Sequence, residues 1–409
     1  MTSKRRVLIV GGSVGGLFAG LALLKQGWDV QVYERVPAEL ASRGAGIVTH
    51  QALFDALHAV GITDLSSLGV SVPGRVTFAS DGSVIGRADR PQVLTAWGRL
   101  YQMLRDAFPD DCYHGGVEML EFSASDSGVQ ASFSNGQSES ANLLIAADGI
   151  YSRVRQQLMP EIQPLYAGYV CWRGLVPENL LSEQALSELF PFFGFTLPRG
   201  EQVLGYPVAG EANDVRPGHR RYNLVWYRPA DEQTVLVDLL TDREGQMNGS
   251  SIAPNLIRTE VIDAMRQDAR SSLSPQFLEM VDKCPEPFLQ PIYDLAVEKM
   301  VHGRVVVMGD AAFVARPHVG MGVTKAADDA MALAAALGSG DVSASALSDF
   351  DRERVAVGRF VVDRARKLGA YMQAQIKTAA ERQQAETFRT PEAVMAETAS
   401  SDFLKDFSL

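Results

Sequence analysis

A cluster of glycines after the first apolar segment has the residue types and the spacing that bind phosphate groups. The cluster runs from Gly11 to Gly16 and directly follows the apolar run 7–10. Its spacing is close to G-x-G-x-x-G, in which the first glycine allows a tight turn, the second lets the backbone approach a pyrophosphate and the third lets a helix pack closely on a strand. Ser13 stands at the second glycine position, where its hydroxyl can donate to a phosphate. The residues predicted to contact phosphate are Gly11, Ser13, Val14 and Gly16, and a tight turn without a ligand is the alternative.

An acidic residue follows at the distance expected for a ribose contact. Glu34 lies 18 residues after Gly16, close to the separation of about 20 at which a carboxylate binds the hydroxyls of a ribose. A carboxylate at this place disfavours a 2′-phosphate and favours the plain ribose of NAD or FAD. Arg35, the next residue, is placed to stack near an adenine. The chemistry that these residues indicate is the binding of a dinucleotide.

A strand, a helix and a second strand must position these residues. The run 6–10 lacks polar alternation and is typical of a buried strand, and 17–26 has helical composition and ends at Gly27. A second strand over 29–33 ends at Glu34. The N-terminal segment is therefore predicted to form a complete β-turn-α-turn-β unit. Phosphate would lie at the N-terminus of its helix, where free N–H groups and the positive end of the helix dipole are found.

Two hairpins and several helices are predicted further along the chain. Asp81-Gly82 predicts the turn of a hairpin over 74–88, and Asn135-Gly136 predicts the turn of a hairpin over 128–147, whose second strand is apolar. The pattern of a buried strand returns at 304–308. Helices are predicted over 51–61, 97–108, 255–283, 324–337 and 346–375, and the last thirty residues are predicted to form a peripheral helix or a frayed tail.

The stretch from about 164 to 290 has a different character. Prolines and aromatic residues are frequent there, and apolar and polar residues alternate in segments such as 221–227. This pattern predicts a largely antiparallel sheet. The fold class predicted for the chain is α/β, with a Rossmann-like domain whose parallel sheet carries an added β-hairpin, and a second α+β domain with a mainly antiparallel sheet.

The composition excludes several classes of protein. The 409 residues are 46% hydrophobic and 21% charged, which is ordinary for a globular protein of about two domains. The net charge of −11 repels phosphate backbones and anionic lipid, so binding to nucleic acid or to a membrane is not expected. No apolar run reaches the roughly 18–20 residues of a membrane span, and no signal peptide is predicted. A cytoplasmic location is expected, and Cys112, Cys171 and Cys284 are too few and too scattered for a disulfide framework or a zinc site.

Two later motifs, taken together with the glycine cluster, resemble a known family. The segment 148–155 begins with Asp-Gly directly after a buried strand, and the segment 303–312 ends with Gly-Asp-Ala-Ala. Pro317 and the glycine-flanked segment 320–322 follow. The order and spacing of these motifs over residues 5–340 resemble the FAD-dependent aromatic hydroxylases, which are single-component flavoprotein monooxygenases.

Shorter features resemble members of this family that act on hydroxypyridines. They are the Gly-Gly-Ser start of the turn, the Arg-Pro-His sequence at 316–318 and the helix start at 325–330. The resemblance implies FAD as cofactor, NADH or NADPH and O₂ as co-substrates, and hydroxylation of an electron-rich aromatic or N-heteroaromatic ring through a flavin C4a-hydroperoxide. A salicylate-hydroxylase-like or epoxidase-like enzyme and a non-catalytic FAD- or NAD-binding redox sensor are the alternatives. The resemblance is also consistent with a homodimer.

The resemblance further implies a FAD-binding domain interrupted by a substrate domain. The FAD-binding domain is predicted to comprise 1–71, 96–163 and 291–345, the substrate domain 72–95 and 164–290, and a C-terminal helix and tail 346–409.

Several further contacts with FAD are implied by the resemblance. Asp310 would hydrogen-bond the ribityl chain, and residues 320–322 would bring backbone N–H groups and a helix dipole to the flavin ring, which favours negative charge on the reduced ring. Val117 would hold the adenine through its backbone. For Arg43 and Arg99, a contact with the flavin and a solvated surface position both stay open. The predicted cofactor-binding set is Gly11, Ser13, Val14, Gly16, Glu34, Arg35, Arg43, Gly46, Arg99, Val117, Asp310, Gly320, Met321 and Gly322.

His318 is the candidate catalytic residue. It lies between Asp310 and the glycines of 320–322, so it is expected to line the reaction chamber. An ordinary histidine pKa near 6.5 suits a base that removes a phenol-type proton. A role in the packing of its loop is the alternative. The predicted substrate pocket comprises Tyr206, Trp226, Tyr227 and Pro317, and a place in the core of the sheet is the alternative for its aromatic members.

Two places depart from the family pattern. Phe313 stands where His is usual after Gly-Asp-Ala-Ala. Met321 stands where Gln is usual between the two glycines, and Thr324 stands where Asn is usual. Side-chain contacts at these places are not expected to follow the family, whereas backbone contacts need only the glycines and the start of the helix.

Overall fold

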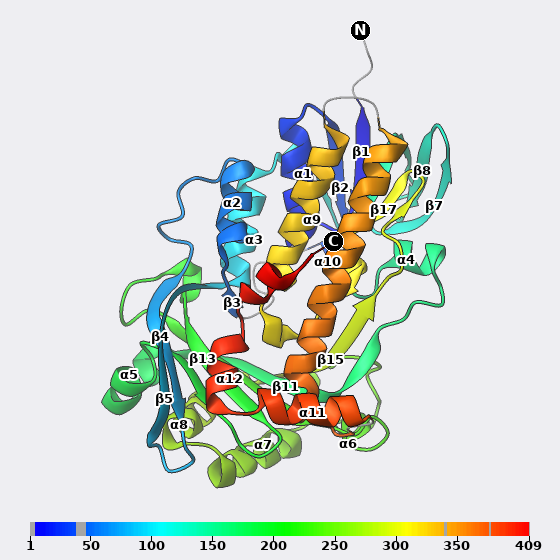
Figure 1. The fold of residues 1–409 in the computed structure, drawn as a ribbon. Helices are drawn as coiled ribbons and strands as arrows, with labels where there is room; N and C mark the ends of the chain where they lie inside the picture. Colours follow the sequence, from blue (N-terminus) through cyan, green and yellow to red (C-terminus); the bar gives the residue numbers. More distant parts are fainter. Residues whose placement is uncertain (1–4, 38–45, 339–341, 376–377, 409) are drawn as a thin grey trace.

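Two sheets, one above the other in the view of Figure 1, form the framework of the molecule. The computed structural model describes residues 5–37, 46–338, 342–375 and 378–408. The upper sheet is mainly parallel and the lower sheet is mainly antiparallel, so the predicted α/β fold class is confirmed.

The upper sheet is built around two apolar strands. β1 (Arg6–Val10) pairs in parallel with β2 (Asp29–Glu34), as predicted for the N-terminal unit, and also with β10 (Leu143–Ala146). Val, Leu and Ile dominate β1 and β10 because both faces of these strands are buried. Among the described strands the order is β16 (Val301–His302), β17 (Val305–Val307), β10, β1, β2 and β6 (Tyr113–Gly115), and β16 alone of these runs antiparallel.

Helices cover the upper sheet and connect it with the lower one. α1 (Val14–Lys25) and α9 (Gly322–Leu337) lie side by side, and α10 (Ala344–Gly369) packs against α9 (Figure 1). The long α10 continues downward to the lower sheet, where it meets β15 (Phe288–Ala296). Three shorter helices complete this half of the described structure: α2 (Gln51–Ala59), α3 (Trp97–Ala107) and α4 (Arg153–Leu158). The small sheet of β7 (Met119–Ser125), β8 (Gly128–Phe133) and β9 (Ser138–Ala141) lies beside them.

The second predicted hairpin differs from its prediction in one respect. Asn135-Gly136 does form its turn, but β8 pairs with the short polar strand β9 and not with the apolar run that follows. That apolar run is β10, which is buried in the parallel sheet. The reason is burial: a strand that is apolar on both faces needs cover on both sides, and a three-stranded surface sheet does not provide it.

The lower sheet carries the second half of the structure. Its described strands run in the order β18 (Phe313–Val314), β15, β11 (Leu165–Pro177), β14 (Arg221–Pro229), β13 (Gln202–Val208), β12 (Phe193–Thr196), β4 (Val70–Phe78), β5 (Val84–Ala96) and β3 (Gly46–Val48). Asp81-Gly82 lies between β4 and β5, where the first hairpin was predicted. The helices on this sheet are α5 (Glu183–Glu188), α6 (Val235–Leu240), α7 (Thr259–Ser272) and α8 (Pro275–Lys283).

We propose that the FAD-binding domain comprises 1–71, 96–163 and 291–345, that the substrate domain comprises 72–95 and 164–290, and that 346–409 form a C-terminal helix and tail. The pairing of the strands does not follow this division everywhere. The strands of the upper sheet come from the segments assigned to the FAD-binding domain. β3 and β18 also come from these segments, yet they pair with β5 and β15 in the lower sheet. Residues 46–48 and 313–314 therefore connect the two halves of the molecule.

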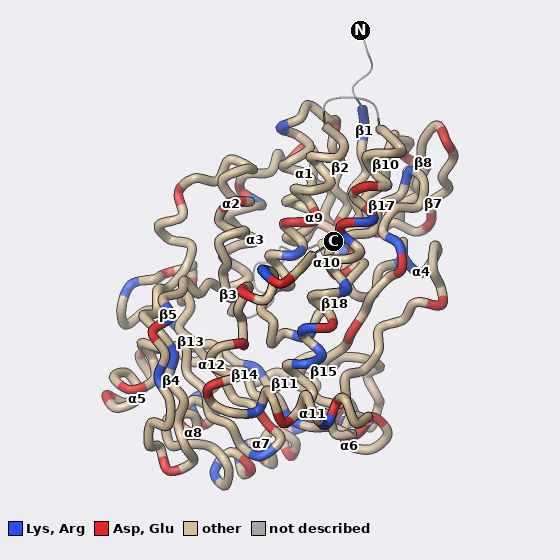
Figure 2. Tube along the Cα trace, viewed as in Figure 1, with Lys and Arg blue, Asp and Glu red and all other residues tan. Residues whose placement is uncertain are grey.

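The C-terminal segment is folded and packed. α11 (Ala379–Phe388) and α12 (Pro391–Glu397) lie across the lower sheet, and the chain then turns up towards α9 and α10 (Figure 1). Lys and Arg are interspersed with Asp and Glu through both halves (Figure 2). No described helix is long and apolar enough to cross a bilayer.

Candidate active site

The turn between β1 and α1 has the close backbone packing that its glycines predict. Gly11 has a φ of 105°, and a Cβ atom there would lie 2.3 Å from the carbonyl oxygen of Ala147. A Cβ atom at Gly16 would lie 1.9 Å from the carbonyl oxygen of Gly11. A side chain at Gly11 would therefore force the turn away from the end of β10, and one at Gly16 would force α1 away from the turn. Ser13 is the N-cap of α1 and makes no capping hydrogen bond with its side chain, so the hydroxyl is available to a ligand.

Glu34 lies beside this turn at the end of β2. Its Oε2 accepts a hydrogen bond from the N–H of Gly12 at 2.8 Å, and its Oε1 accepts one from the N–H of Val36 at 3.0 Å. The N–H of Val117 donates to the carbonyl oxygen of Glu34 at 2.9 Å. The predicted backbone contact of Val117 with an adenine would therefore use its carbonyl group. Arg35 is exposed and lines the same cavity as Glu34.

One buried side chain holds the two later motifs together. Arg155 donates to the carbonyl oxygens of Ala311 at 2.9 Å and of Ile150 at 2.6 Å. Next to it, Oδ2 of Asp148 accepts from the N–H of Arg153 at 2.8 Å, at the start of α4. The other oxygen, Oδ1, is buried and has no hydrogen-bond partner among the described residues. Because Asp148 lines the cavity, this oxygen is suited to accept a hydrogen bond from a hydroxyl of a ligand.

The N-terminus of α9 forms the next part of the wall. Gly320 has a φ of 66°, and a Cβ atom there would lie 2.9 Å from Ala399. A Cβ atom at Gly322 would meet nothing within 4 Å. Met321, by contrast, is buried in an apolar cluster with Val361 and other residues. Its side chain therefore packs inside the protein, and only its backbone is placed to serve a ligand.

Charged residues behind this wall set the electrostatics of Asp310. Burial raises the pKa of Asp310, and the nearby charge of Asp329 raises it further, whereas Lys325 lowers it. Lys325 Nζ lies 3.1 Å from the carbonyl oxygen of Gly309 and 3.2 Å from Oδ2 of Asp329. Arg354 of α10 donates to Oδ1 of Asp329 at 2.8 Å. This buried cluster fixes the start of α9 relative to the turn that carries Asp310.

Two cavities meet at this wall. The turn cavity has a volume of about 500 Å³ and is lined by Gly11, Ser13, Glu34 and Asp148, among others. The aromatic cavity has a volume of about 270 Å³ and is lined by Tyr206, Tyr227, Phe193 and Pro317, among others. The residues that line both are Arg173, Gln290, Asp310, Gly322 and Val323.

The residues present fit FAD. The β1–α1 turn can approach a pyrophosphate, and Glu34 can accept from a ribose. Asp148, whose buried Oδ1 has no partner among the described residues, lines the same cavity. Asp310 and the start of α9 lie where the two cavities meet. A dinucleotide in the turn cavity can therefore extend a ring towards the aromatic cavity.

The aromatic cavity contains three of the four residues predicted for the substrate pocket. Tyr206, Tyr227 and Pro317 line it. The prediction for Trp226 is wrong: its Nε1 donates to Oε2 of Glu201 at 2.8 Å, and its ring packs in the cluster on the other side of the sheet. Successive residues of a strand point to opposite faces, so Tyr227 and Trp226 could not both face the cavity.

His318 does not line the aromatic cavity, contrary to expectation. It is only 1% exposed, and its ring lies edge-on to Tyr227 with a centroid distance of 4.3 Å. Its Nε2 lies 2.8 Å from the hydroxyl of Tyr169, and its Nδ1 lies 3.1 Å from Oε1 of Gln202. Burial, together with the positive charge of Arg316, lowers the pKa of His318 to about 3. A buried, neutral histidine whose two nitrogens are engaged does not fit the role of a base that contacts the substrate.

Three further predicted cofactor residues have different positions. Arg99 lines neither cavity, and its Nε donates to the carbonyl oxygen of Ser67 at 3.1 Å. Arg43 lies outside the described residues. Gly46 lines the aromatic cavity, where its N–H donates to Oδ1 of Asn223 at 2.9 Å. A Cβ atom at Gly46 would lie 2.4 Å from the ring of Tyr206, so this position needs glycine for close packing.

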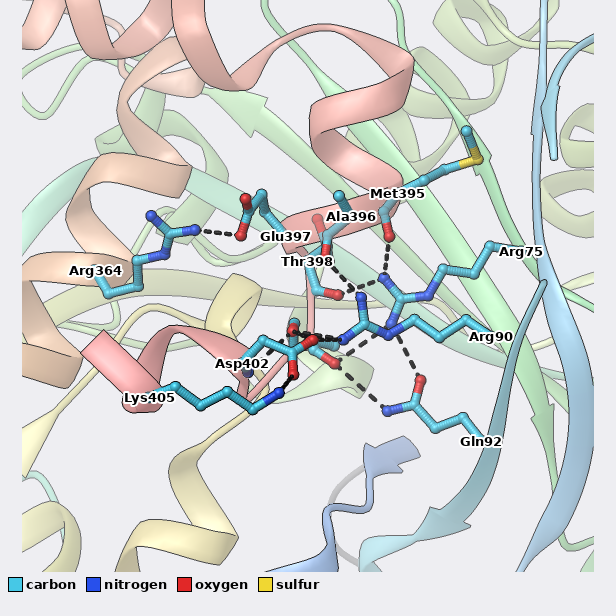
Figure 3. Close-up of polar contacts among 12 residues, drawn as sticks. Arg75, Arg90, Gln92, Arg364, Met395, Ala396, Glu397, Thr398, Asp402 and Lys405 are labelled. Atoms are coloured by element: carbon cyan, nitrogen blue, oxygen red, sulfur yellow. Dashed lines mark hydrogen bonds and ion pairs between the residues drawn. The ribbon is translucent and has the colours of Figure 1, made fainter. Parts of the chain in front are cut away.

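The C-terminal segment forms part of the wall of the aromatic cavity, a role that no pattern in the sequence predicts. Thr398 and Ala399 line the aromatic cavity, and the N–H of Ala399 donates to the carbonyl oxygen of His318 at 2.7 Å. Figure 3 shows how arginines of the β4–β5 hairpin hold this segment. The buried Arg75 donates to the carbonyl oxygens of Met395 and Thr398, both at 2.6 Å.

A second arginine of the same hairpin binds the segment further along. Arg90 donates to the carbonyl oxygen of Ala396 at 2.8 Å and to Oδ2 of Asp402 at 2.6 Å. Arg364 of α10 pairs with Glu397 on the other side. No motif in the sequence predicts the contacts of Arg75 and Arg90 with this segment, because their partners lie more than 300 residues away along the chain.

Comparisons with known proteins find relatives along most of this chain. A family model described as FAD binding domain matches residues 4–169 and 279–365, and one described as FAD binding domain-like matches 166–294. The 2,6-dihydroxypyridine 3-monooxygenase of Paenarthrobacter nicotinovorans is 32% identical over 90% of this chain and 91% of that protein. The solved 2,6-dihydroxypyridine-3-hydroxylase from Arthrobacter nicotinovorans has a TM-score of 0.85 and 30% identity, over 91% of this chain and 93% of that one. The 6-hydroxynicotinate 3-monooxygenase of Pseudomonas fluorescens is 24% identical, over 82% of this chain and 83% of that protein.

Proposed function

The chain belongs to the FAD-binding-domain family of aromatic and heteroaromatic monooxygenases, and from this premise we propose that its substrate is a small hydroxylated pyridine. It is an NAD(P)H- and FAD-dependent enzyme that hydroxylates an electron-rich ring with O₂. The similarity to 2,6-dihydroxypyridine 3-monooxygenase along nearly the whole of both chains supports the pyridine substrate.

The aromatic cavity is the observation on which this proposal depends most. Its volume of about 270 Å³ suits a single ring with small substituents, and it adjoins the place where a flavin ring would lie. Its walls combine aromatic and aliphatic side chains with few polar groups, as is usual for small-molecule sites. The tyrosines Tyr206 and Tyr227 have pKa values raised by burial, so they stay protonated and can donate hydrogen bonds to a ring oxygen or nitrogen.

The chain's own residues bind, orient and shield the reactants. Bound FAD supplies the chemistry by which O₂ is activated and one of its oxygen atoms is transferred. We assign the pyrophosphate to residues 11–14 and the first turn of α1, and a ribose to Glu34. We assign hydroxyls of the ribityl chain to Asp310. The N-terminus of α9 would stabilise negative charge on the reduced ring through its N–H groups and dipole. The C-terminal wall at 398–399 would exclude water from the aromatic cavity.

A panel of three rings tests the substrate assignment. With the FAD-loaded protein, NAD(P)H oxidation is followed after addition of 2,6-dihydroxypyridine, 6-hydroxynicotinate or salicylate, and the products are analysed by mass. The proposal expects the strongest stimulation with a hydroxypyridine and a product heavier by one oxygen atom. Stimulation by salicylate alone would instead support the salicylate-hydroxylase-like alternative. FAD binding without stimulation by any of a wider set of rings would support a redox sensor.

A cytoplasmic location and assembly into a homodimer remain parts of the proposal. Light scattering of the purified protein tests the dimer through its molar mass, and fractionation of the cells that produce it tests the location. A monomer at all protein concentrations would overturn the former, and recovery outside the cytoplasmic fraction would overturn the latter.

A further inference from the structure

Arg173 stands out among the residues that line the aromatic cavity. It lies in the middle of β11, where it is the Cα partner of Val225 on β14 and of Phe288 on β15. It lines both cavities, so its side chain lies at the place where they meet. The charged side chains that line the aromatic cavity are, among the described residues, those of Arg173 and Asp310. Arg173 is therefore the cation that a ring in this cavity would meet.

The guanidinium of Arg173 also has unused hydrogen-bonding capacity. Its Nη1 donates to Oε1 of Gln290 at 3.0 Å, whereas its Nε is buried and has no partner among the described residues. It makes no ion pair with a described carboxylate. Arg173 is half-buried and its hydrogen bond with Gln290 is exposed, so water hydrates the guanidinium where no ligand is bound. The protein thus holds a cation ready for a negatively charged partner.

Four buried arginines are held by acceptors within the protein, although Arg75, Arg155 and Arg354 each also have one buried nitrogen without a described partner. Arg316 pairs with Asp294 through its Nη2 at 2.9 Å, and Arg354 pairs with Asp329. Arg75 and Arg155 donate to backbone carbonyl groups. Arg173 differs from all four because it lines both cavities. Among the described residues its guanidinium has one amide acceptor, Gln290, and lies 6.0 Å from the centre of the Phe288 ring. An anionic ligand at the place where the cavities meet can replace this water and pair with the guanidinium.

The electric field of Arg173 already acts on the ionisable groups around it. Burial raises the pKa values of Cys171, Tyr206 and Tyr227, and the positive charge of Arg173 partly opposes this rise for all three. The other titratable groups that line the cavity are Tyr293 and Asp310. Neither a tyrosine nor an aspartate can carry a positive charge, so neither can stabilise an anion by its charge.

We propose that Arg173 is the anchor for an ionised ring oxygen of the substrate, and that it determines the preference of the enzyme for rings with an acidic hydroxyl. This inference rests on the proposed function. The substrate binds as its anion, the hydroxyl proton having passed to solvent, and Gln290 holds the guanidinium towards the ring. Ionisation increases the electron density of the ring at the carbons that receive oxygen. The ring is thus activated by its ionisation. His318, which packs against Tyr227 and Tyr169, does not need to contact the ring as a base.

The ionisation state of a bound ring tests the proposal directly. The probe is 2,6-dihydroxypyridine, titrated by difference absorbance into FAD-loaded wild-type protein, Arg173→Met and Arg173→Lys at several pH values. We expect the wild type to lower the apparent pKa of the bound hydroxyl by about one unit or more, which corresponds to about tenfold tighter binding of the anion. Arg173→Met should lose that shift and bind the probe about tenfold more weakly, and Arg173→Lys should restore part of both. The pH at which kcat/KM rises should move upward in Arg173→Met.

A matched control separates charge at the site from charge elsewhere. Arg87 on β5 is exposed, and its guanidinium lies 5.2 Å from the centre of the Phe192 ring, outside both cavities. Arg87→Gln should bind the probe as the wild type does. FAD content and Tm are measured for every variant, so that loss of folding is recognised.

The outcomes for Arg173 and for the proposed substrate class are distinguishable. If Arg173→Met binds the anion as tightly as wild type and leaves the bound pKa unchanged, the anchor is wrong even though a hydroxypyridine is the substrate. If 2,6-dihydroxypyridine does not bind but salicylate does, the substrate class is wrong. The same titration with salicylate then decides the role of Arg173. If no ring with an acidic hydroxyl binds the wild type, both assignments fall.

Discussion

His318 stabilises the wall of the aromatic cavity from behind. An amide oxygen can only accept a hydrogen bond, so Oε1 of Gln202 requires a proton on Nδ1, and Nε2 then accepts from the hydroxyl of Tyr169. The ring is neutral in this arrangement, in agreement with a pKa lowered to about 3. We infer that His318 positions Tyr227 and Tyr169, whose rings pack against it.

A pH-dependent stability follows from this burial. Between the ordinary pKa of 6.5 and about 3, the unfolded chain binds a proton at His318 that the folded chain does not bind. The free energy of unfolding should therefore fall as the pH falls through this window, by up to about 1.4 kcal/mol per pH unit from this residue. Urea unfolding at pH 6.5, 5.5 and 4.5 measures it, and His318→Gln should show a shallower loss than wild type. The exposed His58 provides the control, since His58→Gln should keep the wild-type slope. Equal slopes in all three proteins would contradict the assignment.

The sequence predicts residue contacts well where they are local. Gly11, Gly16 and Glu34 were identified because the β-turn-α-turn-β unit that positions them spans a single short segment. The position of His318 was not predictable in the same way. The groups that bury it come from β11, β13 and β14, far away in the chain, and no local pattern reports them.

At the scale of elements, the β1–α1 turn offers a sharp test of cofactor binding. Gly11→Ala introduces a Cβ atom 2.3 Å from the carbonyl oxygen of Ala147 at a φ of 105°. The strain of such a conformation is on the order of 1–3 kcal/mol, and the clash adds to it. We expect FAD affinity to fall at least about tenfold, measured by flavin fluorescence titration. Gly27→Ala is the matched control: its φ is 83° but no atom lies within 4 Å of the new Cβ, so FAD affinity should not change. A similar loss in both variants would show that backbone strain alone is responsible.

The C-terminal segment offers a test of shielding. Arg90→Gln removes the ion pair with Asp402 and the contact with Ala396, which hold the chain that continues from the cavity wall at 398–399. Looser closure should admit water, so that less of the NAD(P)H oxidised leads to hydroxylated product and more leads to hydrogen peroxide. We expect the ratio of product to NAD(P)H consumed to fall by about half or more. Arg87→Gln, on the same strand, should keep the wild-type ratio. An unchanged ratio in Arg90→Gln would show that the contacts of Arg90 with Ala396 and Asp402 do not control closure of the cavity.

Periodicity explains what the sequence could and could not predict about these elements. The alternation in 221–227 correctly predicted a strand, yet it does not tell which face meets the cavity, so Trp226 was assigned together with Tyr227. The polar composition of the last thirty residues is compatible with a loose tail. Their packing depends on Arg75 and Arg90 of a distant hairpin, whose carbonyl and carboxylate partners have no sequence signature.

At the scale of the whole molecule, the two sheets share one binding space. The turn cavity is lined by residues of the upper sheet and its turns, such as Gly11 and Glu34, and also by Arg173 and Gln290 of the lower sheet. The buried cluster of Lys325, Asp329 and Arg354 connects α9 with α10. The long α10 in turn packs against β15 of the lower sheet. A ligand that reaches from the turn to the aromatic cavity adds a further connection between the sheets.

This connection predicts that FAD and ADP stabilise the protein differently. ADP can occupy only the turn side of the site, whereas FAD reaches the place where both cavities meet. A ligand at one hundred times its Kd adds about 2.7 kcal/mol to the free energy of unfolding. At equal concentrations FAD, which makes more contacts, should raise Tm more than ADP does. Differential scanning fluorimetry of the apoprotein measures this, with Gly11→Ala as the variant in which both shifts should shrink. Equal Tm shifts with ADP and FAD in the wild type would mean that contacts of the flavin end with the lower sheet add nothing to the binding free energy. The continuity of the two cavities would then not stabilise the protein.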